Sequence, residues 1–253
     1  MLRTRIIPCL QSRNESLVKT RRFGKFQYIG DPANTCRIFN ELEVDELMFL
    51  DITASREGRA PNFEIIEEIA SECFMPVSYG GGISSVETAE KVLKLGIEKV
   101  VMNSSILERT ELIREVSEAV GRQSVVVAVD VRRGFMGGMF CWGKSGTVKS
   151  SYTPEEWATT AAENGAGEIL LTSIDREGTW KGFDIDLIQR VSSSVSVPVI
   201  AHGGAASVED IGAAVKKGGA AAVALGSMVV FQKKGMGVLV NVPDEAKLNQ
   251  VLA

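Results

Sequence analysis

Short apolar runs alternate with longer amphipathic stretches along the whole chain. The apolar runs have the length and composition of buried strands and lie at residues 5–10, 46–52, 76–79, 99–103, 125–130, 168–173, 198–202 and 221–226. Between them, hydrophobic residues recur with the spacing of one helical face, at residues 32–42, 62–72, 86–95, 110–120, 154–164, 185–191 and 208–217. The pattern predicts strands and helices in alternation.

Residues that favour helix ends lie at the boundaries of these predicted helices. N-caps are expected at Asp31, Ser85 and Thr153, and the first and last of them precede a proline, which suits the first helical turn. Three helices are followed by a glycine that can end them in the left-handed conformation: Gly96, Gly165 and Gly218.

Eight such strand–helix units indicate an α/β protein with a single (β/α)8 barrel, the TIM barrel, over residues 1–253. The strands are almost wholly apolar, as parallel strands that are buried on both faces must be. No linker or low-complexity segment interrupts the pattern, and 253 residues is an ordinary length for one such barrel.

The two halves of the chain resemble each other, which indicates duplicated half-barrels at about residues 1–122 and 123–253. Residues 5–11, 50–52, 80–83 and 103–105 match residues 125–130, 173–175, 203–205 and 226–228. The repeat predicts a carboxylate at both position 11 and position 130, but only Asp130 is present. Gln11 can form hydrogen bonds in its place but cannot exchange a proton at neutral pH.

Composition excludes some classes of partner. Asp and Glu outnumber Lys and Arg by 32 to 28, a formal net charge of −4, which argues against a nucleic-acid surface. The pairs Arg21-Arg22 and Arg132-Arg133 are local basic clusters that either hold phosphate groups or are solvated surface. Because the chain has no signal peptide and no apolar run of about 18 residues, we expect a cytoplasmic protein without a membrane partner.

Residues that bind metals are sparse. Four scattered cysteines form no Cys-x-x-Cys motif, so buried or unpaired thiols are expected at Cys9, Cys36, Cys73 and Cys141. His202 is the single histidine and cannot build an imidazole cluster. We therefore expect no metal site and no cofactor.

Polar residues and glycines gather after the predicted strands, where a (β/α)8 barrel has its active face. The candidate site residues are Gln11, Lys19, Asp51, Gly81, Gly82, Asn103, Ser104, Asp130, Thr172, Asp175, Glu177, Gly178, Gly203, Gly204, Gly226 and Ser227. The paired glycines after the third and seventh strands expose backbone N–H groups, and each pair is followed by a polar turn after the next strand. Two equivalent turns predict a ligand with a phosphate at each end, unless they are only tight turns.

Three aspartates follow strands at this face. Asp130 ends an apolar strand and is a candidate general acid or base, or a cap for the following loop. Asp51 and Asp175 match each other across the repeat and either bind substrate or orient loop backbone.

Charged residues also begin four of the strands, at the opposite mouth of the barrel: Arg5, Glu46, Lys99 and Glu168. Two positive and two negative side chains in one ring can neutralise each other. They form either a salt-bridged plug or a gate through which a small molecule passes.

The chain resembles a known family, the cyclase subunit of imidazole glycerol phosphate synthase (HisF). The resemblance covers essentially the whole chain. It is carried by residues 5–10, 18–19, 30–32, 45–47, 50–55 and 80–83, and above all by the run at residues 165–176.

The resemblance implies a glutaminase (HisH-like) partner that docks on the N-terminal face of the barrel and releases ammonia, which passes the charged gate and the barrel core. At the other face, ammonia reacts with a bisphosphorylated ribulosyl substrate, which is cleaved and cyclised to imidazole glycerol phosphate and an aminoimidazole carboxamide ribotide. Two catalytic aspartates carry this lyase reaction, and Asp130 matches one of them. Lys19, Gly82, Asn103 and Ser227 match substrate or phosphate positions.

The chain departs from the family pattern near the expected reaction centre. Gln11 replaces the first catalytic aspartate, Glu177 replaces an aspartate, and His202 replaces a small residue. Lys19 is followed by Thr20 instead of glycine, and residues 21–29 are unlike the usual first loop.

These features are similar to a branch of the family linked to surface-sugar pathways. In that branch a HisF-like protein and a glutaminase supply ammonia to a separate sugar amidotransferase that makes acetamidino groups. The likeness is carried by residues 19–20, 26–32, 38–40, 68–76 and 226–231.

An amide in place of a catalytic carboxylate removes a factor of about 10²–10⁴ in rate. We therefore predict that ammonia handling is retained and that cyclase activity is weakened. One alternative is a working cyclase of histidine biosynthesis, in which Asp175, Glu177 or His202 supplies the missing proton transfer. The others are the sister sugar-isomerase barrel of the same pathway, which needs no gate, and a scaffold that only docks and activates a glutaminase.

Overall fold

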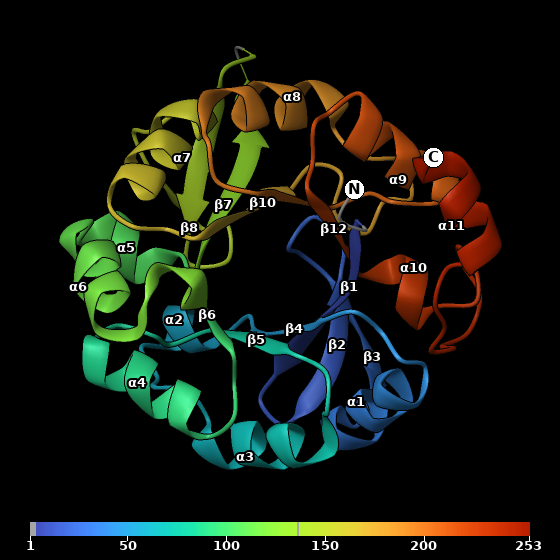
Figure 1. The fold of residues 1–253 in the computed structure, drawn as a ribbon, viewed down its shortest axis with the longest axis horizontal. Coiled ribbons are helices and arrows are strands. Elements are labelled where there is room, and N and C mark those ends of the chain that lie inside the picture. Colours follow the sequence, from blue (N-terminus) through green and yellow to red (C-terminus); the bar gives the residue numbers. More distant parts are fainter. Residues whose placement is uncertain (1–3, 136) are drawn as a thin grey trace.

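Eight parallel strands form a closed barrel in the computed structural model, which describes residues 4–135 and 137–253 (Figure 1). They are β1 (Arg5–Arg13), β4 (Leu47–Asp51), β5 (Val77–Gly80), β6 (Lys99–Met102), β7 (Val125–Arg133), β10 (Glu168–Ser173), β11 (Val199–His202) and β12 (Ala222–Leu225). Each strand pairs with the next, and β12 pairs with β1 to close the ring. The predicted (β/α)8 barrel is confirmed.

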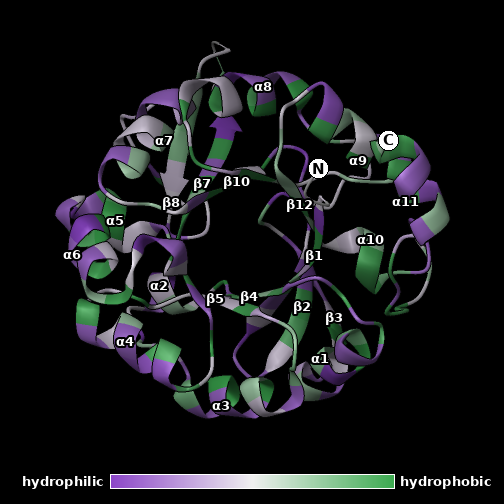
Figure 2. Ribbon diagram, in the orientation of Figure 1, coloured by the Kyte–Doolittle hydropathy of each residue, from purple (hydrophilic) through white to green (hydrophobic). Residues whose placement is uncertain are grey.

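A layer of helices surrounds the barrel (Figure 1). Its main members are α1 (Pro32–Glu41), α3 (Phe63–Glu72), α4 (Val86–Lys94), α6 (Glu111–Val120), α7 (Pro154–Glu163), α8 (Ile185–Ser194), α9 (Val208–Lys216) and α11 (Glu245–Leu252). Figure 2 shows hydrophobic and hydrophilic positions alternating along these helices. Their buried residues, such as Phe39 and Trp157, pack against the outward-facing residues of the strands in one large apolar cluster. This packing holds the barrel closed.

Successive residues of each barrel strand face opposite sides of its wall, as the pleat requires. Along β7, Val125, Val127 and Val129 belong to the outer cluster, whereas Val126 and Ala128 belong to a second apolar cluster inside the barrel. The inner cluster also contains Ile7, Cys9, Met48, Val101, Leu170, Ile200, Ala222 and Ala224. The lumen is therefore lined by apolar side chains at mid-height.

Two hairpins extend the barrel wall and were not predicted. β1 continues into β2 (Ser16–Thr20) and β3 (Phe26–Gly30), and β7 continues into β8 (Met139–Gly143) and β9 (Val148–Lys149). Gln11 pairs with Val18 in the first hairpin, and Asp130 pairs with Trp142 in the second. Positions 11 and 130 thus occupy corresponding places in the two hairpins.

Helix ends follow their predicted caps with one exception. The side chains of Asp31, Ser85 and Thr153 each accept a hydrogen bond from a backbone N–H of their helix. Gly96 and Gly165 have φ angles of 101° and 103°. The prediction for Gly218 is wrong, because the left-handed residue is Gly219 with φ of 76°. Gly218 is required for another reason: a Cβ there would lie 2.6 Å from Ala214 O.

Short helices after several strands were also missed. α2 (Ala54–Glu57), α5 (Ser104–Glu108) and α10 (Ser227–Val230) follow β4, β6 and β12, and the 3-10 turn η1 (Arg122–Ser124) precedes β7. α11 supplies the eighth outer helix and packs on α9. One-turn helices have too few residues to show a periodic pattern.

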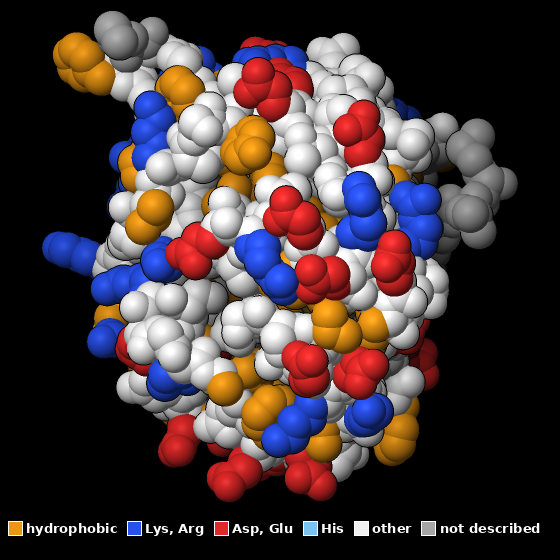
Figure 3. All heavy atoms as spheres, turned by 90° about the vertical axis from the view of Figure 1, so that its left-hand side faces the viewer, with side chains coloured by type: hydrophobic (Ala, Val, Ile, Leu, Met, Phe, Trp, Pro, Cys, Tyr) orange, Lys and Arg blue, Asp and Glu red, His pale blue; other side chains and the backbone are white. Residues whose placement is uncertain are grey.

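The helical surface carries mixed charge. On the face that lies at the left-hand side of Figure 1, Figure 3 shows acidic and basic side chains interspersed over the surface. In the part of the chain that the structure describes, no helix combines the length and apolar character needed to cross a membrane. Cys9, Cys36 and Cys141 are buried free thiols, as predicted, and Cys73 is a partly exposed one.

We expect Phe39→Ala to lower the free energy of unfolding by about 3–5 kcal/mol, because its ring is fully buried between α1 and the strands. Phe74→Ala, at a side chain that is 89% exposed, is the matched control and should change stability by less than about 0.5 kcal/mol. Urea denaturation of the two variants tests this, and equal losses would contradict the packing described here.

Candidate functional site

A cavity of about 840 Å³ lies at the carboxyl ends of the barrel strands. It is lined by residues from both halves of the chain, among them Gln11, Thr20, Asp51, Gly80, Gly81, Gly82, Asn103, Ser104, Asp130, Ser145, Thr172 and His202. Many of the residues that the sequence singled out are therefore brought together at one mouth of the barrel. We call this hollow the central cavity.

Asp130 is the acidic residue at the end of β7 and points into the central cavity. Burial raises the pKa of its carboxyl group to about 7, and the negative charge of Glu177 adds to this, while a hydrogen bond from Thr172 opposes it. Asn103 Nδ2 lies 3.4 Å from Asp130 Oδ2 and 3.0 Å from Ala128 O. A carboxyl group with a pKa near neutrality can both give and take a proton.

Gln11 lies on β1 and lines the central cavity, where hydrogen bonds fix the orientation of its amide group. Thr20 N and Thr20 Oγ1 both lie 3.0 Å from Gln11 Oε1, and Lys19 Nζ lies 3.3 Å from it. Because a backbone N–H and an ammonium group can only donate, this atom must be the carbonyl oxygen. Within residues 4–135 and 137–253, no protein group accepts a hydrogen bond from Gln11 Nε2. The NH₂ group is therefore available to a ligand in the central cavity.

Lys19 and Glu177 form a buried ion pair beside Gln11. Thr20 Oγ1 also lies 2.9 Å from Glu177 Oε1, and Phe23 N donates to Glu177 Oε2 at 3.1 Å. Burial alone would raise the pKa of Glu177, but the charge and hydrogen bond of Lys19 outweigh it and lower the pKa. A phosphate that binds Lys19 must compete with this carboxylate.

His202 stands at the end of β11 between the central cavity and a smaller one. Its Nδ1 lies 3.2 Å from Thr172 Oγ1. Burial lowers the pKa of His202 to about 4, and the positive charge of Lys19 lowers it further, against the opposing effect of Glu177. The imidazole is neutral at pH 7, so it offers no positive charge to an anion.

Both predicted glycine turns have the conformation that requires glycine. Gly81 and Gly82 have φ angles of 119° and 75°, and Gly203 and Gly204 have 98° and 108°. A Cβ on Gly81 would lie 2.5 Å from Asp51 O, and one on Gly204 would lie 2.3 Å from Gly182 O. Each turn is thus packed against the loop of the preceding strand, with no side chain to cover its backbone.

The second glycine turn lines a separate cavity of about 270 Å³. This second cavity is lined by Lys19, Glu177, Gly178, Trp180, His202, Gly203, Gly204, Ala205, Ala224, Gly226 and Ser227. Gly81, Gly82, Asn103 and Ser104 belong to the central cavity instead. The two predicted anion sites therefore lie in different hollows.

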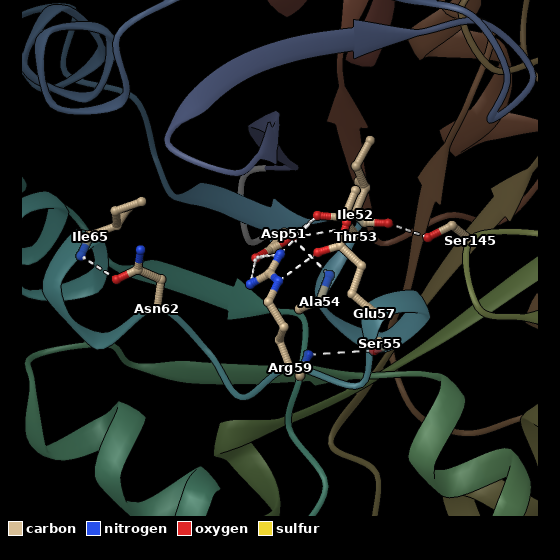
Figure 4. Close-up of polar contacts among 11 residues, drawn as sticks. Asp51, Ile52, Thr53, Ala54, Ser55, Glu57, Arg59, Asn62, Ile65 and Ser145 are labelled. Atoms are coloured by element: carbon tan, nitrogen blue, oxygen red, sulfur yellow. Dashed lines mark hydrogen bonds and ion pairs between the residues drawn. The ribbon is translucent and has the colours of Figure 1, made fainter.

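Asp51 has both carboxylate oxygens occupied by protein donors, although it lines the central cavity. Oδ1 accepts from Thr53 N at 2.9 Å and Ala54 N at 3.0 Å, and both terminal nitrogens of Arg59 lie 3.3 Å from Oδ2. Figure 4 shows the Arg59 guanidinium and the Thr53 side chain converging on this carboxylate. Asp51 orders the loop after β4, the second of the two roles considered for it.

Asp175, its counterpart, lies outside the central and second cavities. Its Oδ2 accepts from Arg133 N at 2.9 Å, so it fastens the end of β7 to the loop after β10. The predicted substrate contact at Asp175 is not supported by this placement. The path of the loop decides whether such a side chain faces the cavity, and no sequence pattern reports it.

Some residues of the site were not found from the sequence. Arg59 holds Asp51, and Ser145, from the turn between β8 and β9, donates to Ile52 O. Figure 4 shows this contact, which joins the two halves across the cavity. An arginine eight residues after a loop aspartate is no recognisable signal, and Ser145 lies on a hairpin that was itself unpredicted.

The four charged residues at the opposite mouth form a closed ring. Arg5 pairs with Glu46 at 2.6 Å and with Glu168, and Lys99 pairs with each of the same carboxylates at 3.0 Å. Ser78 Oγ donates to Glu46 Oε1 at 2.7 Å. This charged ring (Arg5, Glu46, Lys99, Glu168) has equal numbers of cations and carboxylates and lies at the N-terminal ends of the barrel strands. No group of three or more His, Cys, Asp or Glu side chains within residues 4–135 and 137–253 could hold a metal ion.

We expect Asp130→Asn to raise the free energy of unfolding at about pH 8 by roughly 1–3 kcal/mol, with little effect at about pH 4. The folded protein keeps the Asp130 proton up to a pKa of about 7, whereas the ordinary value is 3.8. The stabilising contribution of the neutral acid is therefore complete at low pH and is lost as the pH rises between these values. Urea titrations at several pH values test this. Glu118→Gln, an exposed control on α6, should change stability by less than about 0.5 kcal/mol at both pH values.

Known proteins are similar to this chain over nearly its full length. Residues 5–234 match the family described as histidine biosynthesis protein. A protein of Pseudomonas aeruginosa, provisionally named imidazole glycerol phosphate synthase subunit hisF2, is 49% identical over 249 residues, covering 98% of this chain and 99% of that protein.

Two further relatives have related names. A protein of Vibrio vulnificus, provisionally named subunit hisF3 of the same synthase, is 45% identical and covers 100% of this chain and 97% of its own length. The HisF subunit of imidazole glycerol phosphate synthase from Hyphomonas neptunium is 46% identical over 232 residues, or 91% of each chain. The chain therefore belongs to the histidine biosynthesis protein family and, within it, to the HisF proteins.

Proposed function

We propose that this HisF-type barrel receives ammonia from a glutaminase subunit at its N-terminal face and delivers it to the central cavity or beyond. The acceptor is a phosphorylated compound or a sugar, in the biosynthesis of acetamidino sugars of surface polysaccharides. One observation carries the proposal. The charged ring is complete at one end of the barrel, while Gln11 stands at the other end in the place that the repeat reserves for an aspartate.

The lumen between these ends suits ammonia. It is lined by small and medium apolar side chains such as Ala128, Ala222 and Ala224. Uncharged NH₃ can cross such a layer, whereas an ammonium ion would lose its hydration there without a partner. The charged ring must open at one ion pair for a molecule to enter. Each of its members forms two ion pairs, so each keeps one partner when a single pair opens.

A glutaminase partner is supported by the names of the relatives, which are subunits of a synthase. The barrel face beside the charged ring also has an anchor for a partner. Phe74 lies just before β5, at the N-terminal end of the barrel strands, and is 89% exposed. Exposed aromatic side chains are common anchors of protein interfaces.

The chemistry at the central cavity is expected to be incomplete for ring closure. Asp130 can exchange a proton, but its counterpart Gln11 cannot. Glu177 is a poor substitute, because its pKa is lowered by Lys19 and its oxygens are already bonded. His202 is neutral and buried against Thr172. The names hisF2 and hisF3 of two relatives also fit a second HisF-type protein beside one that serves histidine synthesis.

The second candidate function is a working cyclase of histidine biosynthesis. The name of the Hyphomonas relative favours it, and so do the two glycine turns, whose uncovered backbone N–H groups suit a ligand with a phosphate at each end. The Gln11 amide could then orient the substrate while Asp130 alone transfers protons.

Ammonium salt and the bisphosphorylated ribulosyl substrate should turn over slowly with the purified protein. Gln11→Asp should raise the rate by roughly 100-fold, because Thr20 and Lys19 can donate to a carboxylate as they do to the amide. The exposed change Gln123→Asp is the control and should have no effect. Turnover by the unchanged protein at the rate of an ordinary cyclase, with no gain from Gln11→Asp, would instead identify a working cyclase.

Lys99→Met should increase the fraction of ammonia that escapes from the glutaminase complex into solution, by several-fold. The change removes two of the four ion pairs of the charged ring and leaves its two carboxylates with Arg5 alone. An ammonia-coupled assay measures the escape, and gel filtration checks that the complex still forms. Lys94→Met, at an exposed i,i+4 pair, is the control. Unchanged escape with intact binding would indicate a scaffold, and no binding to any glutaminase would refute the proposal.

A further inference from the structure

A third hollow lies outside the barrel mouth, between the β2–β3 hairpin and the segment that follows α10. It has a volume of about 1120 Å³ and opens to solvent. It shares Lys19, Gly178, Trp180 and Ser227 with the second cavity. We call it the hairpin groove. Lys19, Gly178 and Ser227 are candidate site residues from the sequence, but neither the repeat nor the family resemblance points to Lys25, Lys234 or the aromatic residues of this groove.

The hairpin groove is strongly cationic. Arg21, Lys25 and Lys234 line it, together with Lys19 at its inner end, and no acidic residue lies among the lining residues. Lys19 is neutralised by Glu177. In the described part of the chain, Arg21, Lys25 and Lys234 have no ion-pair partner. Three uncompensated cations around one concave surface favour a ligand with several negative charges.

Aromatic side chains line the same groove. They are Phe26, Trp180 and Phe231. Phe26 is 50% exposed, and Arg13 stacks on its ring at 4.2 Å. Trp180 has a φ angle of 58°, a left-handed conformation that a glycine would adopt without strain. The indole side chain therefore stands at a position whose left-handed backbone conformation is unfavourable for any residue other than glycine.

The groove is separated from the central cavity by bonded side chains. Thr20 lines both hollows, and it is tied to Gln11 and to Glu177. Lys19 closes the same wall through its ion pair with Glu177. A ligand in the hairpin groove therefore need not reach Asp130 or displace anything from the central cavity.

We propose that the hairpin groove binds a nucleoside diphosphate or a ligand built on one. The diphosphate lies among Arg21, Lys25 and Lys234, and the planar base lies against Trp180 and Phe231. Guanidinium and ammonium groups are the usual partners of phosphate oxygens, and indole and phenyl rings offer stacking surfaces for a base. The site goes beyond the proposed ammonia transfer and does not depend on it.

Titration calorimetry with UDP, ADP, pyrophosphate and uridine tests this. A nucleoside diphosphate should bind more tightly than pyrophosphate, which has the charge without the base, and uridine should bind most weakly. Lys234→Ala should weaken nucleoside diphosphate binding by about tenfold. Lys233→Ala is the matched control, because this neighbouring lysine is exposed but does not line the groove.

Trp180→Leu separates the two parts of the ligand. It should weaken UDP or ADP binding and leave pyrophosphate binding unchanged, with circular dichroism as the check on folding. Equal affinities for pyrophosphate and the nucleoside diphosphates would overturn the proposal in favour of a simple anion site. Equal effects of Lys233→Ala and Lys234→Ala, or no nucleotide binding at millimolar concentrations, would also overturn it.

Discussion

The alternation of side chains along the barrel strands is the constraint on which the rest of this structure depends. Since every second residue faces the lumen, Arg5, Ile7, Cys9 and Gln11 form one inward row on β1. Lys99, Val101 and Asn103 form another at β6, and Glu168, Leu170 and Thr172 a third on β10. Each row begins with a charge, crosses an apolar layer and ends in a polar group. Three layers of different chemistry are thus built from single strands.

Gln11 is embedded in a local network and is not an isolated replacement. Its carbonyl oxygen receives hydrogen bonds from Thr20 and Lys19, and both of these residues also bind Glu177. An uncharged side chain at position 11 leaves Lys19 in need of a counter-ion, and Glu177 supplies it. The departures from the family pattern at positions 11, 20 and 177 therefore form one physical unit, in which the buried charges balance.

Most of the barrel and part of the site could be predicted from the sequence. Strand periodicity and capping residues locate the eight strands and the main helices, because both are local properties. The charged ring and the glycine turns follow from their positions at strand ends. Three features could not be predicted: the ion pair between residues 19 and 177, the Arg59 contact to Asp51, and the position of Asp175 outside the cavity. They depend on loop paths, and loop paths leave no periodic signal.

The nine-residue strands β1 and β7 limit which insertions and deletions this protein can accept during evolution. Inserting or deleting one residue within either strand would exchange its lumen-facing and helix-facing rows, moving charge into the apolar shell and large hydrophobic side chains into the lumen. The hairpins that continue from these strands are outside this constraint, although their tips bond to the loops after β10 and β4 through Phe23 and Ser145. New binding specificity can arise at the rim by loop variation, while the layered lumen below fixes the lengths of the strands.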